Sequence, residues 1–161
     1  SQSDAVRKSI EELSPVILRT NVRLALENMA NDDFKLIGQL LEEFGSDLVG
    51  ICYDCGHGNI RKGEGLDHLE RFKDRLIAVH IHDNDGTADH HWVPFTGTVD
   101  FPRLARIIAA SSYTGCISLE SNINSLPEVK KATFVKDAFE AATGLAQMVE
   151  DEKESLSKQE A

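Results

Sequence analysis

Four side chains that can bind a divalent cation stand at the ends of four separate apolar segments of the sequence. They are Glu27, Asp54, His80 and Glu120. Carboxylates gathered in one layer with an imidazole repel one another unless their charge is compensated. A divalent cation removes that repulsion and fixes the geometry, and mixed oxygen and nitrogen ligands suit Mn²⁺, Mg²⁺, Co²⁺ or Zn²⁺. The sequence therefore predicts a site for one divalent metal ion without selecting the metal.

The apolar segments that carry these residues are predicted to be β-strands, because each is short and rich in apolar residues. They cover residues 21–28, 48–54, 76–82 and 116–120. Side chains alternate between the two faces of a strand, so each segment has one aliphatic face and one small or polar face. In the third segment Ile77, Val79 and Ile81 form the aliphatic face, and His80 and His82 lie on the other. The four metal-binding candidates all fall on the small or polar face.

Helices are predicted around these strands from apolar residues at helical spacing. They cover residues 4–18, 34–44, about 65–72, a stretch after Asp100 and about 128–149. Pro15 is expected to end or kink the first helix, Asp32 or Asp33 to cap the second, and Gly45 to end it. Strands that alternate with helices imply an α/β fold with about four parallel strands. Residues 1–150 are expected to form one domain, followed by a polar tail at 151–161 that is a fraying helix end or disordered.

Composition excludes several classes of function. The 161 residues include 27 acidic and 17 basic side chains, for a formal net charge of −10. This balance argues against a nucleic-acid or anionic-membrane partner, which would need clustered Lys and Arg. No apolar run approaches the roughly 18 residues of a membrane span. Three cysteines are too few for a disulfide framework, which predicts free thiols in a reducing, cytoplasmic compartment.

Several motifs together resemble one known family. LALEN, YDCGH, VHIHDNDGTADHHWVPFTGTVDF and YTGCISLES, in this order and spacing, are similar to the second half of the xylose-isomerase-like (β/α)8 barrels. That superfamily contains sugar and sugar-phosphate isomerases and epimerases, inosose dehydratases, and the endonuclease IV type of AP endonuclease (family 2). The resemblance covers about residues 20–120 and implies a half or partial (β/α)8 barrel of TIM-barrel type.

The resemblance also implies roles for individual residues. It makes Glu27, Asp54, His80 and Glu120 the ligands of one metal ion, with Glu27 and Glu120 also acting as catalytic base and acid. It implies substrate contacts for His57, His82, Asp89 and His91, and in the endonucleases the matching His57 and the D-x-H pair bind further metal. The expected reaction is proton transfer through an enediolate in a sugar or sugar phosphate, as isomerisation or epimerisation. The alternative is an abasic-site DNA repair enzyme like endonuclease IV.

The length leads to one further expectation. A complete barrel of this kind takes about 250 residues, and four strands leave two sheet edges unpaired. A further alternative is therefore a half-barrel that is not active alone. We expect the half-barrel to pair with another copy of itself, with an N-terminal half, or through swapped elements.

Overall fold

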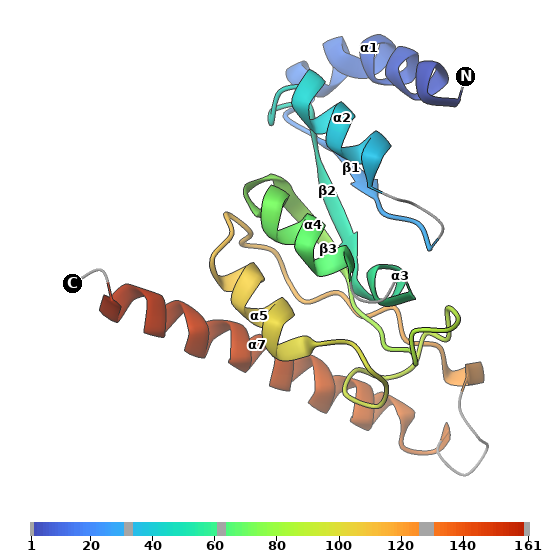
Figure 1. Ribbon diagram of the computed structural model, residues 1–161, viewed down its shortest axis with the longest axis vertical. Helices are drawn as coiled ribbons and strands as arrows, with labels where there is room; N and C mark the ends of the chain where they lie inside the picture. The colour runs from blue at the N-terminus through green and yellow to red at the C-terminus, as the bar shows by residue number, and fades with distance from the viewer. Residues whose placement is uncertain (1, 31–33, 61–63, 126–130, 160–161) are drawn as a thin grey trace.

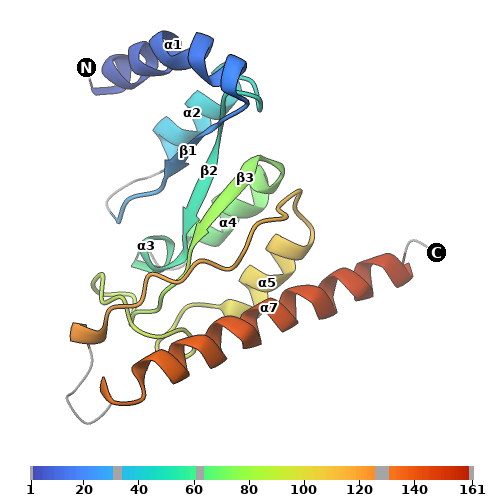
Figure 2. The ribbon, with the colours of Figure 1, turned by 180° about the vertical axis from the view of Figure 1, so that it is seen from behind.

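The chain forms a three-stranded parallel sheet with helices packed on one face, as the computed structural model shows in Figures 1 and 2. The structure describes residues 2–30, 34–60, 64–125 and 131–159. Strand β1 (Leu24–Glu27) pairs with β2 (Val49–Asp54), and β2 pairs with β3 (Leu76–His80). The strands lie in chain order with helices between them, which confirms the predicted βα repeats.

The main helices cover one face of this sheet. Helices α2 (Lys35–Glu43) and α4 (Glu64–Phe72) lie on that face, and α1 (Gln2–Thr20) packs outside α2 (Figure 1). Helix α5 (Phe101–Ala109) continues the layer and packs against the long α7 (Phe134–Gln159). Figure 2 looks onto the opposite face of the strands, over which no helix of the described chain lies. This open face ends at the short helix α3 (Cys55–Ile60).

The predicted aliphatic face forms the core under these helices. Val49, Ile51 and Tyr53 of β2 are at most 1% exposed and belong to one cluster with Leu40 of α2 and Leu69 of α4. Burial of large apolar side chains on both layers stabilises the packing of helices on the sheet. One face of the sheet is therefore covered by helices and apolar. The other face carries no helix of the described chain and can hold polar side chains.

The alternation predicted for the third strand is wrong at Ile77. Ile51 pairs with Leu76 but the next residue, Cys52, pairs with Ala78, so Ile77 is an extra residue in a bulge. The bulge turns the Ile77 side chain over Gly50, where a Cβ would lie 2.8 Å from its Cδ1 atom. Leu76 takes the core position instead and is 2% exposed. Beyond the bulge the predicted alternation is restored.

The predicted fourth strand is reduced to a single bridge in the described chain. Ile81 pairs in parallel with Leu119, because its N–H donates to the Ser118 carbonyl (2.8 Å) and its carbonyl accepts from the Glu120 N–H (2.9 Å). Segment 116–120 therefore lies in the position expected of a fourth strand but lacks a continuous ladder. These two bonds are sufficient to place Glu120 beside the end of β3.

The described residues test only some of the predicted helix ends. Helix α1 does not end at Pro15 but runs to Thr20, and Ile17, beyond the proline, is 5% exposed. The caps expected at Asp32 or Asp33 lie outside the described residues, as does the expected start of the last helix at 128.

The polar tail is helical rather than disordered as far as it is described. Helix α7 continues through Gln159, and Lys153–Glu150 and Lys158–Glu154 ion pairs lie along its surface. Such pairs three or four residues apart support an exposed helix. Within the described ranges, no helix is both long and apolar enough to cross a membrane.

Candidate functional site

The strand ends bring Glu27, Asp54, His80 and Glu120 together, and we call these four residues the open cluster. One possible ligand atom from each lies within 4.8 Å of the others. His80 Nδ1 is 3.1 Å from Glu27 Oε1, 3.6 Å from Glu120 Oε2 and 4.0 Å from Asp54 Oδ2. Parallel pairing explains the grouping, since Asp54 faces His80 across β2 and β3 and Glu27 ends the neighbouring strand. The arrangement can hold a cation between oxygen and nitrogen donors.

The open cluster is buried on one side and accessible on the other. The Asp54 side chain is 0% exposed, whereas Glu27 and Glu120 are 31% and 42% exposed. The two glutamates come from opposite edges of the strand array, β1 and the segment after Leu119. A small molecule could therefore reach the cluster from the open face of the sheet.

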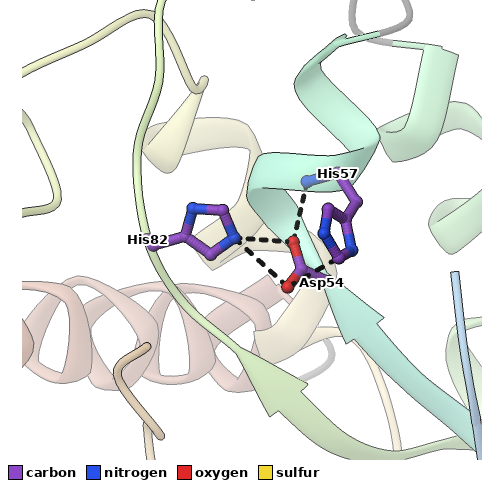
Figure 3. Close-up of side chains that lie close together, drawn as sticks. All are labelled: Asp54, His57 and His82. Carbon is purple, nitrogen blue, oxygen red and sulfur yellow. Dashed lines mark hydrogen bonds and ion pairs between the residues drawn. The ribbon is translucent and has the colours of Figure 1, made fainter. Parts of the chain in front are cut away.

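The buried carboxylate of Asp54 is held by neighbouring donors (Figure 3). Its Oδ1 accepts from the His57 backbone N–H (2.7 Å) and from His82 Nε2 (3.0 Å), which also lies 3.2 Å from Oδ2. Burial acts to raise the pKa of Asp54, but the hydrogen bond and charge of His82 and the His57 amide outweigh it and leave the pKa lowered. Asp54 is thus kept as an anion in a fixed orientation.

The same Asp54 contact explains a helix that sequence reasoning missed. Helix α3 contains two glycines within six residues, so its propensity is poor. Asp54 precedes it and accepts from the N–H three residues later, which is the bond of an N-terminal cap. The sequence signal for this helix was an Asp three residues before His57, which is the spacing of an N-terminal cap.

Asn28 is another residue at the site that sequence reasoning did not single out. It is 0% exposed, and its side-chain amide donates to the Asp54 carbonyl (2.8 Å) and accepts from the Asp54 N–H (2.9 Å). Its own carbonyl accepts from His57 Nδ1 (2.9 Å). Asn28 therefore ties the end of β1 to the end of β2 and orients His57.

The sequence-predicted substrate residues gather beside the open cluster, and we call His57, His82, Asp89 and His91 the histidine cluster. Asp89 Oδ2 lies 3.2 Å from His57 Nε2 and 3.0 Å from His91 Nε2, and Asp89 Oδ1 lies 3.7 Å from His82 Nε2. Ligand atoms of His82, Asp89 and His91 fall within 4.8 Å of one another. The loop is therefore folded so that Asp89 and His91, the two residues of the D-x-H motif, face each other and His82.

Backbone carbonyls orient two rings of the histidine cluster. His91 Nδ1 donates to the Glu120 carbonyl (2.8 Å), as His57 Nδ1 does to Asn28, so both rings turn Nε2 toward Asp89. Burial acts to lower the pKa of His91, but the Glu120 carbonyl and the Asp89 carboxylate outweigh it and raise that pKa. Substrate contact by these residues stays a prediction. His82, which is fully buried, lies behind Asp54 rather than on the open side.

Asp83 and Asn84 fix the long loop that carries the histidine cluster. Asp83 is 0% exposed and accepts from the backbone N–H groups of Asn84, Gly97 and Val99. Gly97 is required here because a Cβ would collide with Asn84. The loop is thus held by a buried carboxylate.

The cysteines beside the site are neutral thiols. Burial and the charges of Glu27, Asp54 and Glu120 raise the pKa of Cys52 to about 12. Cys55 is also buried and its pKa is raised, first by burial. Cys52, Cys55 and Cys116 form no disulfide. The free cysteines agree with the prediction of free thiols.

Relatives of the chain are about twice its length. It is 34% identical over 146 residues to the uncharacterized protein y4fM of Sinorhizobium fredii (strain NBRC 101917 / NGR234), which covers 88% of this chain and 47% of that protein. It is 27% identical over 140 residues to the uncharacterized protein MJ1311 of Methanocaldococcus jannaschii, covering 82% of this chain and 47% of that protein. The chain thus spans about half the length of the curated relatives it matches.

Solved structures with the same fold are also longer than this chain. A D-tagatose 3-epimerase-like protein superimposes with a TM-score of 0.62 at 24% identity, over 89% of this chain and 58% of that one. The 3-keto-D-glucoside 4-epimerase YcjR from E. coli gives 0.61 at 24% identity, over 90% of this chain and 52% of that one. Both similarities show a shared fold.

The family assignment rests on the sequence as a whole. The model of the family described as xylose isomerase-like TIM barrel matches residues 2–145. The parallel βα repeats and the polar strand ends agree with part of such a barrel. This chain therefore belongs to the xylose isomerase-like TIM barrel family.

Proposed function

We propose that this chain carries the metal-binding and proton-transfer groups of a divalent-metal-dependent sugar or sugar-phosphate isomerase or epimerase. The observation that carries the proposal is the open cluster, in which three carboxylates and one imidazole converge on one point. It lies at the carboxyl ends of parallel strands, where enzymes with α/β barrels have their active sites. Membership of the family and the two epimerases that share the fold support this class of reaction.

The donor set suits a divalent cation. Glu27, Asp54 and Glu120 offer oxygens and His80 a nitrogen, which is a combination that Mn²⁺, Mg²⁺, Co²⁺ or Zn²⁺ can accept. When bound, such an ion polarises a substrate carbonyl and the adjacent hydroxyl and so acidifies the C–H bond between them.

The two glutamates are the proposed base and acid. Glu27 and Glu120 stand at opposite edges of the cluster and both reach the accessible side. One can remove a proton from the substrate carbon and the other can return a proton, to the neighbouring carbon in an isomerase or to the opposite face in an epimerase. His57, Asp89 and His91 lie beside them and can orient sugar hydroxyls by hydrogen bonds.

A second set of strands would complete the site. The outer edge of β1 is unpaired in the described chain, and Val22 next to it is 57% exposed. Because relatives and fold neighbours are about twice as long, we propose that the outer edge of β1 pairs with further βα units, from another copy of this chain or from an N-terminal half.

The free thiols fit the cytoplasmic compartment that the sequence predicts.

Solvent isotope exchange tests the proposed reaction. The protein is incubated in D₂O with one divalent metal at a time and a panel of ketoses and ketose phosphates, and deuterium at carbon is followed by NMR. We expect deuterium next to the carbonyl, loss of exchange on chelation and recovery on addition of metal. Exchange that persists after complete removal of metal would contradict metal dependence.

A second candidate, an endonuclease IV-like abasic-site enzyme, is favoured by the histidine cluster. Asp89 with three histidines offers donors for further cations beside the open cluster. The net charge of −10 argues against binding to a phosphate backbone. Incubation of an abasic-site duplex with the zinc-loaded protein tests this candidate, and an uncut duplex would remove it.

A further inference from the structure

His82 is fully buried at the junction of the two clusters. Its Nε2 lies 3.0 and 3.2 Å from the two oxygens of Asp54 (Figure 3). Its Nδ1 is buried and has no hydrogen-bond partner among the described residues. An imidazole that donates through Nε2 can present Nδ1 as an acceptor, and no described donor reaches that atom.

The ring of His82 is held on more than one side. It stacks on His91 with ring centroids 4.1 Å apart and an angle of 14° between planes. A Cβ at Gly56 would overlap the ring, so the backbone of α3 approaches it closely. The Sγ–H of Cys55 donates to the His82 carbonyl (3.1 Å). These contacts leave the ring little freedom to turn away from Asp54.

The two oxygens of Asp54 have different surroundings. Oδ1 accepts from the His57 N–H and from His82 Nε2. Oδ2 lies farther from His82 Nε2 (3.2 Å), lies 3.5 Å from His57 Nδ1, and is the oxygen of Asp54 that faces His80 Nδ1, at 4.0 Å, in the open cluster. The two shortest contacts, from the His57 N–H and His82 Nε2, are made to Oδ1, which leaves Oδ2 on the side of the open cluster.

We propose that His82 is a positioning residue, whose Nε2–H anchors Asp54 so that Oδ2 points at the centre of the open cluster. The inference rests on the proposed metal site and adds a residue that acts through Asp54. Outer partners that orient metal-binding side chains commonly change metal affinity by about 10–100-fold. His82 belongs behind the site rather than in contact with a substrate.

A matched pair of substitutions separates the hydrogen bond from the volume of the ring. His82→Gln keeps an N–H donor close to the position of Nε2, and His82→Met has similar length without a donor. Co²⁺ binding is titrated by its visible absorption, which reports both affinity and coordination geometry. We expect His82→Met to weaken binding by about 10–100-fold and alter the Co²⁺ spectrum, and His82→Gln to restore most of both.

The outcomes distinguish this role from the proposed function. Co²⁺ binding by His82→Met with the wild-type affinity and spectrum would overturn the positioning role and leave the metal site intact. Equal weakening in both variants, with both folded by circular dichroism, would also overturn it, because the donor would then be irrelevant. Absence of Co²⁺ binding in the wild-type protein would overturn the metal site itself.

A measurement on the wild-type protein covers the case in which the variants do not fold. Long-range ¹H–¹⁵N NMR spectra identify which nitrogen of His82 carries the proton, before and after addition of Zn²⁺. We expect the Nε2–H form in both states. Loss of that proton with a shift typical of metal ligation would make His82 a ligand and would overturn the proposal.

Discussion

The open cluster and the histidine cluster are joined through the hydrogen bond from His82 to Asp54, but they compensate charge in different ways. The open cluster contains three carboxylates and a single imidazole. In the histidine cluster one carboxylate, Asp89, is surrounded by three imidazoles. The open cluster therefore needs a cation from outside to balance its carboxylates. The histidine cluster contains imidazoles that can donate hydrogen bonds to Asp89.

The backbone also contributes differently to the two clusters. His57 and His91 are each oriented by a carbonyl, those of Asn28 and Glu120. The Glu27 and Glu120 carboxylates of the open cluster are partly exposed and face each other across His80. This contrast agrees with the proposed function, in which the accessible carboxylates transfer protons and the oriented imidazoles bind and position the substrate.

The largest expected effect comes from removal of a proposed proton-transfer group. Glu120→Gln keeps the size of the side chain but removes the base or acid at one edge of the open cluster. General acid–base groups contribute about 10²–10⁴-fold to rate, so we expect solvent deuterium exchange to fall by that factor. Glu64→Gln, an exposed glutamate at the start of α4, is the control and should keep the wild-type rate. An unchanged rate in Glu120→Gln would assign the chemistry elsewhere.

Asp54→Asn tests whether the open cluster depends on its buried anion. The substitution removes a charged metal ligand. It also places an amide where the Asp54 carboxylate now accepts from the His57 N–H and His82 Nε2. We expect affinity for Co²⁺ or Mn²⁺ to fall by more than the about 10–100-fold typical of outer partners. Calorimetric titration measures it, with the exposed Asp47→Asn as control. Equal affinities in the two variants would show that Asp54 is not a ligand.

The convergence of the open cluster could be predicted from the sequence because it depends on a simple regularity. Side chains alternate along a strand, and the carboxyl ends of parallel strands share one edge. Glu27, Asp54 and His80 end three neighbouring strands and meet as expected. Glu120 joins them although its segment makes only a single bridge, since the hydrogen bonds around Ile81 suffice to place it.

Features that depend on non-local contacts could not be predicted in the same way. The bulge that turns Ile77 over Gly50 arises from the pairing of β2 with β3, and the sequence of neither strand alone indicates it. Asn28 binds the backbone of Asp54, 26 residues away, and nothing in its immediate sequence distinguishes it from a turn residue. Helix α3 is a different case, because its cap from Asp54 is local and only three residues away, but the poor propensity of its two glycines hid the helix.

Asn28→Ala tests the backbone link that serves both clusters. The change leaves the N–H and carbonyl of Asp54 buried without their partner, which costs about 1–3 kcal/mol of stability. Urea unfolding measures the loss. Asn122→Ala, which removes one exposed hydrogen bond to the Asn124 N–H, should cost less than 1 kcal/mol. Equal losses in the two variants would mean that the link between β1 and β2 is not important for stability.

The smallest expected effect on the open cluster comes from Asp89→Asn, and it separates the two clusters most directly. Asp89 Oδ1 is 3.7 Å from His82 Nε2, beyond a hydrogen bond, so Asp89 does not share in the hydrogen bond by which His82 holds Asp54. We expect Co²⁺ affinity at the open cluster to change by less than about tenfold, below the effect of losing a direct outer partner. Asp85→Asn, on the same loop and paired with His90, is the matched control.

The stoichiometry of Zn²⁺ binding then gives Asp89→Asn its second readout. One equivalent of Zn²⁺ in both the wild type and the variant would fit a histidine cluster that positions a substrate while a single ion occupies the open cluster. Two equivalents in the wild type and one in Asp89→Asn would instead make the histidine cluster a metal site and favour the endonuclease-like candidate. A large loss of affinity at the open cluster would contradict the separation itself, because the three histidines around Asp89 would then act with Asp54 as one unit.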